Sequence, residues 1–155
     1  MIDNGELWRF ITYAFGHMSL FHYILNTPLL LILSRPLEKY YGSKMFLLLY
    51  TVLSLCSGLS IYYFYQGDYP LAGSSGAGYG LIGIFTFFVL RYPHKISSYD
   101  KRFILIFLVL SLIFTLSVPN ISISGHVGGI ISGFVIAFII SIIESDKKDV
   151  FFYHK

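Results

Sequence analysis

The sequence has few charged residues and almost no cysteine, and both shortages exclude large classes of protein. Only 12% of its 155 residues are charged, about half the fraction that is usual in water-soluble globular domains. Cys56 is the single cysteine, so the chain has no disulfide framework and no cysteine-based metal site. A soluble domain with an ordinary polar surface does not fit this composition.

Apolar residues make up 55% of the chain, and they are gathered in long stretches. Five stretches come close to the length of about 17–25 residues with which a helix spans a bilayer; they lie at 18–33, 45–65, 71–90, 103–118 and 127–143. Joined by short loops, they leave too few polar faces to form a soluble protein around a buried core. The sequence therefore predicts an all-α, polytopic transmembrane helical bundle with five spans.

The positions of the basic residues predict how the bundle is oriented. Lys and Arg in short loops mark the cytoplasmic side, and ten of the eleven fall in alternate loops or after the last stretch: Arg35, Lys39, Lys44, Arg91, Lys95, Lys101, Arg102, Lys147, Lys148 and Lys155. The opposite loops, 66–70 and 117–122, contain none. This alternation independently supports five spans.

The same alternation assigns the two ends of the chain. It predicts a cytoplasmic tail at 146–155 and places Met1 on the outer side, so we expect a further transmembrane helix upstream of Met1. Because the basic residues are divided among three loops, they are better explained as topology determinants than as nucleic-acid contacts. The sequence predicts no nucleic-acid partner.

Acidic residues are absent from all five apolar stretches. The chain has eight of them: Asp3, Glu6, Glu38, Asp68, Asp100, Glu144, Asp146 and Asp149. A Ser-His-Asp triad at membrane depth is therefore hard to build, and a Ser-His dyad is what the residues permit. A metal site is disfavoured for the same reason, although His17, His22 and His126 remain possible ligands.

Two polar groups at membrane depth are suited to acyl-transfer chemistry. Ser75 follows Gly73 in a glycine-rich opening of the third stretch, and His126 stands next to the start of the last one. Burying a hydroxyl and an imidazole is costly unless they satisfy each other, and the histidine can act as the base for the serine. Ser75 is preferred to Ser74 because Tyr79, four residues later, shares its helix face and can pack against the histidine.

His22 and Asn26 are four residues apart on the first stretch and project from one face. Together with the backbone N–H of Ser75 they can stabilise an oxyanion, an effect worth about 3–4 kcal/mol per donor. The alternative is interhelical hydrogen bonding, worth about 0.6–2 kcal/mol each. His17 is at the membrane boundary, where tying the preceding loop to the bundle is an equally good explanation.

In these features the sequence resembles the rhomboid family of intramembrane serine proteases, over nearly the whole chain. The resemblance rests on these residues in this order: Trp8, Arg9, His17, His22, Asn26, Gly73, Ser75, Gly76, Tyr79, Gly80, His126, Gly129 and Gly133. A short Gly-x-Ser-Gly motif alone would be weak, whereas this ordered set is specific. The family core has six helices, and by this comparison the chain begins in the loop after the first of them.

The resemblance implies a role for each site residue. Ser75 would be the nucleophile and His126 its general base, with no metal and no cofactor. His22, Asn26 and the Ser75 amide would form the oxyanion hole. Gly73 would leave room in the loop, and Tyr79 would stack on His126.

The resemblance also implies substrates and a location. Substrates would be single-pass membrane proteins, cleaved within or just outside their transmembrane segments at small side chains near helix-destabilising residues. The chain would be organised as an interfacial loop at 1–17, a transmembrane domain at 18–145 and the tail at 146–155. The resemblance implies a multi-pass membrane protein, and the composition suits a bacterial inner membrane. The oligomeric state is open.

The sequence leaves two alternative functions open and predicts a gate over the site. An inert rhomboid-like protein that binds transmembrane helices is the main alternative, although such proteins usually lack one of the catalytic pair. A small transporter or channel half would call for intramembrane acids or inverted repeats, and neither is seen. Finally, we expect the loop at 117–122 and the Phe-rich span before it to gate the site, with Phe103 and Phe107 as bulky gate residues.

Overall fold

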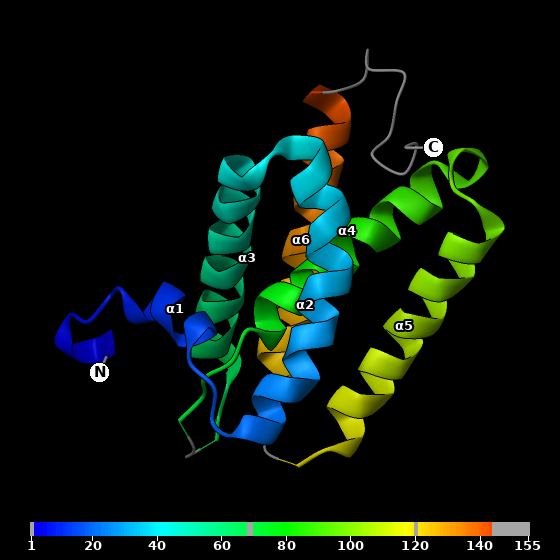
Figure 1. Cartoon of the computed structure of the whole chain (residues 1–155). Helices are drawn as coiled ribbons and strands as arrows, with labels where there is room; N and C mark the ends of the chain where they lie inside the picture. The colour runs from blue at the N-terminus through cyan, green and yellow to red at the C-terminus, as the bar shows by residue number, and fades with distance from the viewer. Residues whose placement is uncertain (1, 68–69, 120, 144–155) are drawn as a thin grey trace.

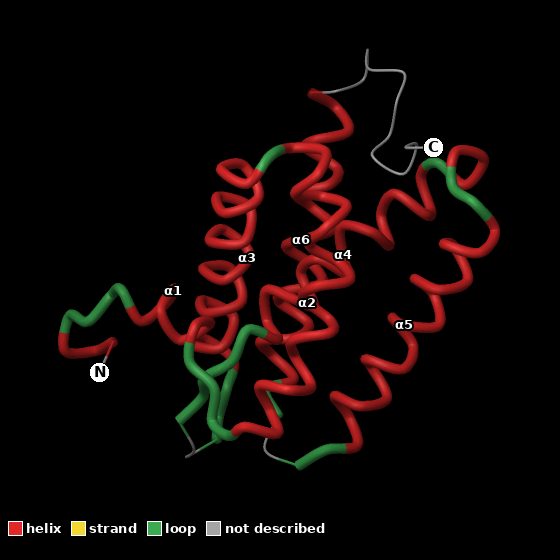
Figure 2. Tube along the Cα trace, in the orientation of Figure 1, coloured by secondary structure: helices red, strands yellow, loops and turns green. Residues whose placement is uncertain are grey.

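A computed structural model describes residues 2–67, 70–119 and 121–143, and throughout these ranges the regular elements are helices (Figures 1 and 2). The elements are η1 (Ile2–Asn4), α1 (Arg9–Thr12), η2 (Tyr13–Phe15), α2 (Leu20–Tyr41), α3 (Ser43–Phe64), α4 (Ser75–Arg91), η3 (Pro93–Lys95), α5 (Ser98–Ser117) and α6 (Ile123–Ile143). The all-α prediction is confirmed. The predicted tail at 146–155 and the end of the transmembrane domain at 144–145 lie outside the described residues.

Helix α2 starts where its sequence predicts and ends later. The Ser19 hydroxyl accepts a hydrogen bond from the His22 backbone N–H at 3.1 Å, an N-cap that fixes the first turn. The helix then runs through Pro28 and Pro36 to Gly42, whose φ of 81° ends it. Arg35 and Glu38 end the apolar run, but polar residues do not break a helix, so α2 continues beyond residue 33.

Helix α4 is the centre of the bundle. All its residues from 76 to 89 are buried, which is the pattern of a helix with apolar residues on every side. It packs most extensively on α6 (Figure 1). A Cβ atom at Gly129 or Gly133 of α6 would collide with a carbonyl oxygen of α4, so the two backbones touch. Gly129 and Gly133 are therefore small residues that permit close packing of two helices.

The outer surface of the bundle is apolar, as lipid requires. Leu47 and Leu48 of α3 and Val135 of α6 are about half exposed. Among the described residues, α3 and α6 are each long and apolar enough to cross a membrane, and α2 reaches that standard only together with Arg9–Phe15, from which it is bent by 95°. Helix α4 is a shorter apolar helix. The number of spans therefore remains a prediction.

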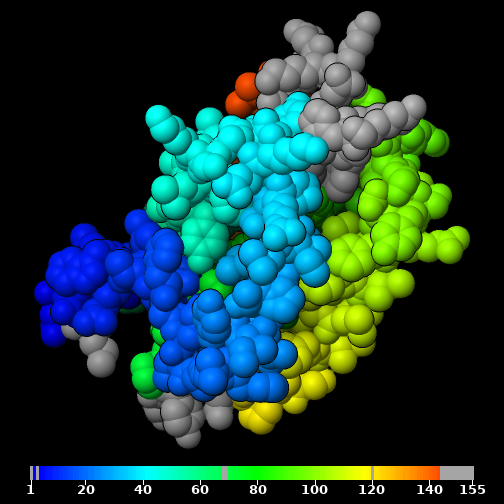
Figure 3. Space-filling model, in the orientation of Figure 1, coloured from blue at the N-terminus to red at the C-terminus, as the bar shows by residue number. Residues whose placement is uncertain are grey.

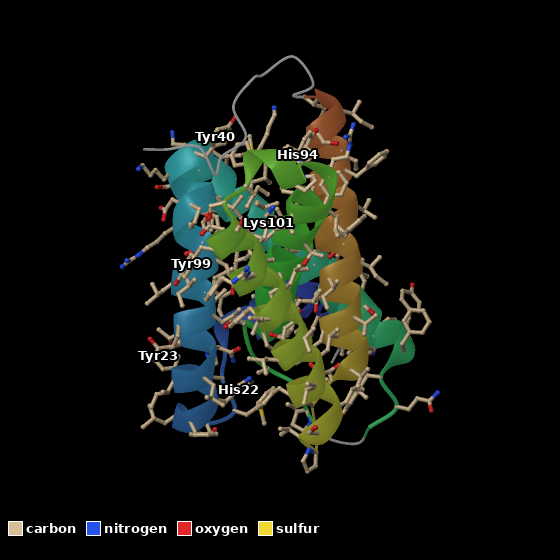
Figure 4. All side chains as sticks on the ribbon, turned by 90° about the vertical axis from the view of Figure 1, so that its right-hand side faces the viewer. His22, Tyr23, Tyr40, His94, Tyr99 and Lys101 are labelled. Carbon is tan, nitrogen blue, oxygen red and sulfur yellow. The ribbon has the colours of Figure 1, made fainter. Side chains whose placement is uncertain are left out.

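The loops that carry basic residues share one end of the bundle. The turn at Gly42 and the connection through η3 both lie toward the top in Figure 1, and Figure 4 shows Tyr40 and His94 toward that end and His22 and Tyr23 toward the other. This arrangement agrees with the alternation of charge along the sequence. The assignment of this end to the cytoplasm stays a prediction.

The N-terminal residues form a lobe beside the bundle (Figure 3). Leu7 and Trp8 are mostly exposed, while the Arg9 guanidinium donates to the Glu6 carboxylate at 2.6 Å and holds the pKa of that carboxyl down to about 2. An exposed tryptophan beside an arginine suits the headgroup boundary. The interfacial role of residues 1–17 remains a prediction.

Replacing Leu53 with alanine is expected to lower the free energy of unfolding by about 2 kcal/mol. Leu53 is fully buried in α3 and fills the space in front of Gly80 of α4. Its truncation leaves a cavity between two helices, and van der Waals packing is the main force that joins helices in a membrane. Leu47→Ala on the exposed face of α3 is the control; equal midpoints for both variants in detergent-induced unfolding would contradict the expectation.

Candidate active site

Ser75 and His126 meet across the α4–α6 contact. The Ser75 hydroxyl lies 2.9 Å from Nε2 of His126. Ser75 is the first residue of α4, and His126 is in the first turn of α6 with 5% of its surface exposed. The backbone contact between Gly76 and Gly129 lies beside this pair. The close approach that the glycines permit is what brings the two side chains within hydrogen-bonding distance.

Helix α3 also holds the first turn of α6 in place. The Ser57 and Ser60 hydroxyls of α3 donate to the carbonyl oxygens of Gly125 and Ser124, each at 2.8 Å. Both acceptors lie within two residues of His126 along the chain. The position of the imidazole is therefore set by hydrogen bonds from α3 as well as by packing on α4.

Tyr79 stacks on the imidazole, as its spacing from Ser75 predicted. The ring centroids of Tyr79 and His126 are 3.8 Å apart and the planes differ by 11°. Both rings are buried. A buried aromatic face against the imidazole fixes the plane of the ring and leaves its two nitrogen atoms to hydrogen-bond at the edges.

The second nitrogen of His126 has a partner that the sequence did not indicate. Nδ1 lies 2.8 Å from the hydroxyl oxygen of Thr115, near the end of α5. The Thr115 hydroxyl also lies 2.7 Å from the Tyr79 hydroxyl and 2.8 Å from the Ser111 carbonyl oxygen. A threonine inside an apolar stretch belongs to no motif, so only the packing of three helices identifies it.

Gly73 and His22 are in contact at the entrance to α4. Gly73 has φ of 153°, a conformation that favours glycine, and a Cβ atom there would overlap the His22 imidazole. The Gly73 N–H donates to the Tyr13 carbonyl at 3.0 Å, which ties this loop to the N-terminal segment. The absence of a side chain at Gly73 is what lets His22 lie against the loop before Ser75.

Asn26 is buried one turn from His22, and its amide nitrogen donates to the His22 carbonyl at 3.1 Å. Within the described residues, neither Asn26 nor the His22 ring hydrogen-bonds Ser75 or His126. The His22 ring is therefore near the start of α4 through the Gly73 contact, and the oxyanion role of both side chains remains a prediction.

His17 pairs with the other serine. Its Nε2 lies 3.2 Å from the Ser74 hydroxyl, and its ring is 5.4 Å from that of His22 in an edge-to-face arrangement. Adjacent serines thus face different histidines, Ser74 toward His17 and Ser75 toward His126. This agrees with the preference for Ser75, and it makes His17 a tether between the preceding loop and α4.

The start of α4 offers backbone donors beside the Ser75 hydroxyl. The first intrahelical bond of α4 runs from the Gly78 N–H to the Ser74 carbonyl at 2.9 Å, so the N–H groups of Ser75, Gly76 and Ala77 precede it. Such groups lie at the positive end of the helix dipole and can bind an anion. The described residues contain no group of three or more His, Cys, Asp or Glu side chains placed to hold a metal ion.

The fold and the site define an integral membrane protein that carries a serine–histidine pair at the contact of two helices. The Rhomboid domain family matches residues 4–143, and the chain belongs to the rhomboid family.

Several relatives support this membership. "Rhomboid protease GluP" of Bacillus subtilis is 32% identical over 130 residues, which are 84% of this chain and 25% of the relative. "Putative rhomboid protease YdcA" of the same organism is 29% identical over 83% of this chain and 65% of its own length. "Inactive RHOMBOID-like protein 8" of Arabidopsis thaliana is 26% identical over 83% of this chain and 37% of its own length. The chain thus spans between a quarter and about two thirds of these relatives.

Proposed function

We propose that the chain is an intramembrane serine endopeptidase that cleaves transmembrane segments of single-pass membrane proteins with a Ser75–His126 dyad. The distance of 2.9 Å between the Ser75 hydroxyl and His126 Nε2 carries this proposal. The names of the two Bacillus relatives support a protease. Both relatives come from a bacterium, which supports a bacterial plasma membrane as the location of this chain.

Acyl transfer by this pair proceeds in two halves. As the Ser75 oxygen attacks the carbonyl carbon of the scissile peptide bond, His126 Nε2 takes its proton, and a tetrahedral intermediate forms. His126 then gives the proton to the leaving amine nitrogen as the C–N bond breaks. Water attacks the acyl-enzyme in the same way, with His126 as base, and Ser75 regains its proton as the acid product leaves.

The oxyanion of the intermediate is stabilised by donors at the start of α4. The Ser75 N–H is one, because it has no acceptor inside the helix. Asn26 is a second: an amide group has two N–H donors, and the bond to the His22 carbonyl uses one of them. The His22 imidazole, packed against Gly73, is the third.

The chemistry restricts the substrate to helices that unwind locally. In a regular transmembrane helix each peptide bond is shielded by its own hydrogen bonds, so its carbonyl carbon cannot reach Ser75. Helix-destabilising residues near the cleaved bond expose it, and small side chains there let it approach a serine at the contact of two helices. Single-pass proteins are suitable substrates because their one transmembrane helix can move out of the surrounding lipid without unfolding a larger bundle.

We propose that a gate lies near the end of α5. Ser111 and Thr115 are the α5 residues that hydrogen-bond to the site, whereas Phe103 and Phe107 lie about 18 and 12 Å from Thr115 along the helix. The two phenylalanine rings stack on each other and pack against the core. A gate at this site therefore involves the end of α5 near Thr115, so Phe103 and Phe107 are poorly placed for that role.

The alternative function is helix binding without cleavage, as the name of the inactive Arabidopsis relative suggests for that protein. A hydrogen-bonded Ser75 and His126 favour the enzyme, because an inert protein has no need to keep this pair together. The test is product formation from labelled single-pass substrates that carry helix-destabilising residues, reconstituted with the chain in liposomes. Binding of these substrates by folded protein with no product from any of them would leave the inert alternative.

Replacing Asn26 with alanine is expected to lower kcat by about 10- to 100-fold with little change in KM. The reason is that the lost donor acts on a charge present only in the transition state. Thr27→Val removes a polar group from the same turn of α2 and serves as the control. If kcat of Asn26→Ala equals that of the control in the liposome assay, Asn26 has only the structural role shown by its bond to His22.

A further inference from the structure

Within the described residues, Thr115 is the only α5 residue whose side chain hydrogen-bonds to the proposed dyad. Its oxygen lies 2.8 Å from His126 Nδ1, on the edge of the ring opposite to Ser75, and 3% of the residue is exposed. We propose that Thr115 is a positioning residue that fixes the tautomer and direction of His126. This inference rests on the proposed function and extends it to a third helix.

The surroundings of Thr115 determine which way its proton points. The Ser111 carbonyl oxygen lies 2.8 Å from the Thr115 hydroxyl and 2.6 Å from the Tyr79 hydroxyl. A carbonyl oxygen can only accept, so the hydroxyl group at each of these contacts is the possible donor. Thr115 therefore donates its proton to Ser111 and presents its own oxygen to His126.

Counting protons identifies the tautomer that fits. If Nδ1 of His126 carries the proton, it donates to Thr115, Thr115 donates to Ser111, and the Nε2 lone pair faces the Ser75 hydroxyl. If Nε2 carries the proton instead, Thr115 must donate to Nδ1, and its oxygen then lies 2.8 Å from the Ser111 carbonyl with no proton between them. In either tautomer, one contact among the oxygen atoms of Thr115, Tyr79 and Ser111 has no proton between them, and this tautomer adds a second. Such a buried contact between two acceptors is unfavourable. The network therefore favours the tautomer that has a proton on Nδ1.

This tautomer is the one that catalysis requires. A general base accepts the Ser75 proton at Nε2 only if that nitrogen is unprotonated. In a triad a buried carboxylate selects this form, and here no acidic residue lies in the apolar stretches. A neutral hydroxyl backed by a carbonyl oxygen performs the orienting part of that role without burying a charge in the membrane.

Two helices thus hold the imidazole from two directions. Tyr79 of α4 covers the face of the ring at 3.8 Å, and Thr115 of α5 fixes its Nδ1 edge. The stack defines the ring plane but allows the ring to turn within that plane. The Thr115 bond removes this freedom and directs Nε2 at Ser75.

The kinetic test uses three variants of the full chain in the liposome assay. Thr115→Val keeps the shape and removes the hydroxyl, and it should lower kcat by about 10-fold with KM nearly unchanged, because the loss is one neutral hydrogen bond. Thr115→Ser restores the hydroxyl and should recover most of kcat. Ser117→Ala removes an exposed hydroxyl two residues further along α5, and it should have wild-type kcat. Wild-type kcat in Thr115→Val, or equal loss in Thr115→Ser, overturns the proposal.

The second test reads the tautomer without a substrate. In ¹⁵N NMR of the protein in detergent, the His126 signals should show Nδ1 protonated in the wild type and a mixture of tautomers in Thr115→Val. A proton on Nε2 in an active wild-type protein overturns the role of Thr115 while the proposed function stands. A proton on Nδ1 in a folded protein that cleaves nothing overturns the proposed function and supports Thr115 as the residue that orients His126.

Discussion

Replacing Ser75 with alanine is expected to reduce cleavage of a labelled single-pass substrate in liposomes by at least about 10⁴-fold. The variant keeps the fold, because alanine occupies the first position of α4 without strain, but it removes the only oxygen that His126 Nε2 contacts in the described residues. Among the described residues, no other hydroxyl lies within hydrogen-bonding distance of this nitrogen. The measurement is the initial rate of product formation at equal amounts of folded protein.

Ser74→Ala is the matched control for this loss. It deletes a neighbouring hydroxyl that lies 3.2 Å from His17, so it should change the rate by only a few-fold. Product that persists in Ser75→Ala at the wild-type rate would assign the chemistry to another residue. Equal losses in both variants would show that disruption of the loop before α4, and not removal of the nucleophile, explains the effect.

The helices were predictable from the sequence because membrane spans have a simple composition, but their ends were not. The apolar stretch at 71–90 begins before α4 does, since Gly73 adopts a positive φ and the chain becomes helical only at Ser75. Conversely, α2 continues past residue 33 to Tyr41 through Pro36. Hydropathy marks where side chains suit lipid, whereas backbone geometry decides where a helix starts and ends.

The central pair of the site was predictable for a different reason. Ser75 and Tyr79 lie one turn apart on a single helix, so their shared face follows from helix geometry, and a buried hydroxyl and imidazole each need a partner. Thr115 was missed because its contact with His126 depends on how α4, α5 and α6 pack together. No spacing along the chain encodes that arrangement.

Asn26 illustrates a limit of spacing arguments. Its separation from His22 predicts a common face, and the structure has the two residues in contact, but through the Asn26 amide and the His22 backbone carbonyl. Short polar side chains often bond to a backbone carbonyl one turn earlier. This bond uses one N–H of the amide group that the sequence pattern assigns to the oxyanion hole. Spacing alone therefore cannot separate the structural role of Asn26 from the catalytic one.

Replacing Gly129 with alanine is expected to lower the free energy of unfolding by about 2–3 kcal/mol and the cleavage rate by more than about 100-fold. The added Cβ would collide with the Gly76 carbonyl oxygen and lie 3.1 Å from the Gly80 nitrogen. These are backbone atoms, which cannot move aside by changing a rotamer, so α6 must shift away from α4. That shift moves His126 away from Ser75, because each side chain is next to the contact on its own helix.

The control for Gly129→Ala is Val135→Ile, which also adds one methyl group to α6 but at a position that is 49% exposed. It should leave both thermal stability in detergent and cleavage rate unchanged. If Gly129→Ala is equally stable and active, α4 and α6 do not depend on backbone contact, and the distance between Ser75 and His126 must be maintained by the α3 hydrogen bonds to Ser124 and Gly125. If it is destabilised yet fully active, the shift of α6 does not move His126 away from Ser75, and the expectation of a joint loss is wrong. The expected joint loss of stability and rate follows from a single cause, since the glycines that join the two helices also set the distance across which the proton moves.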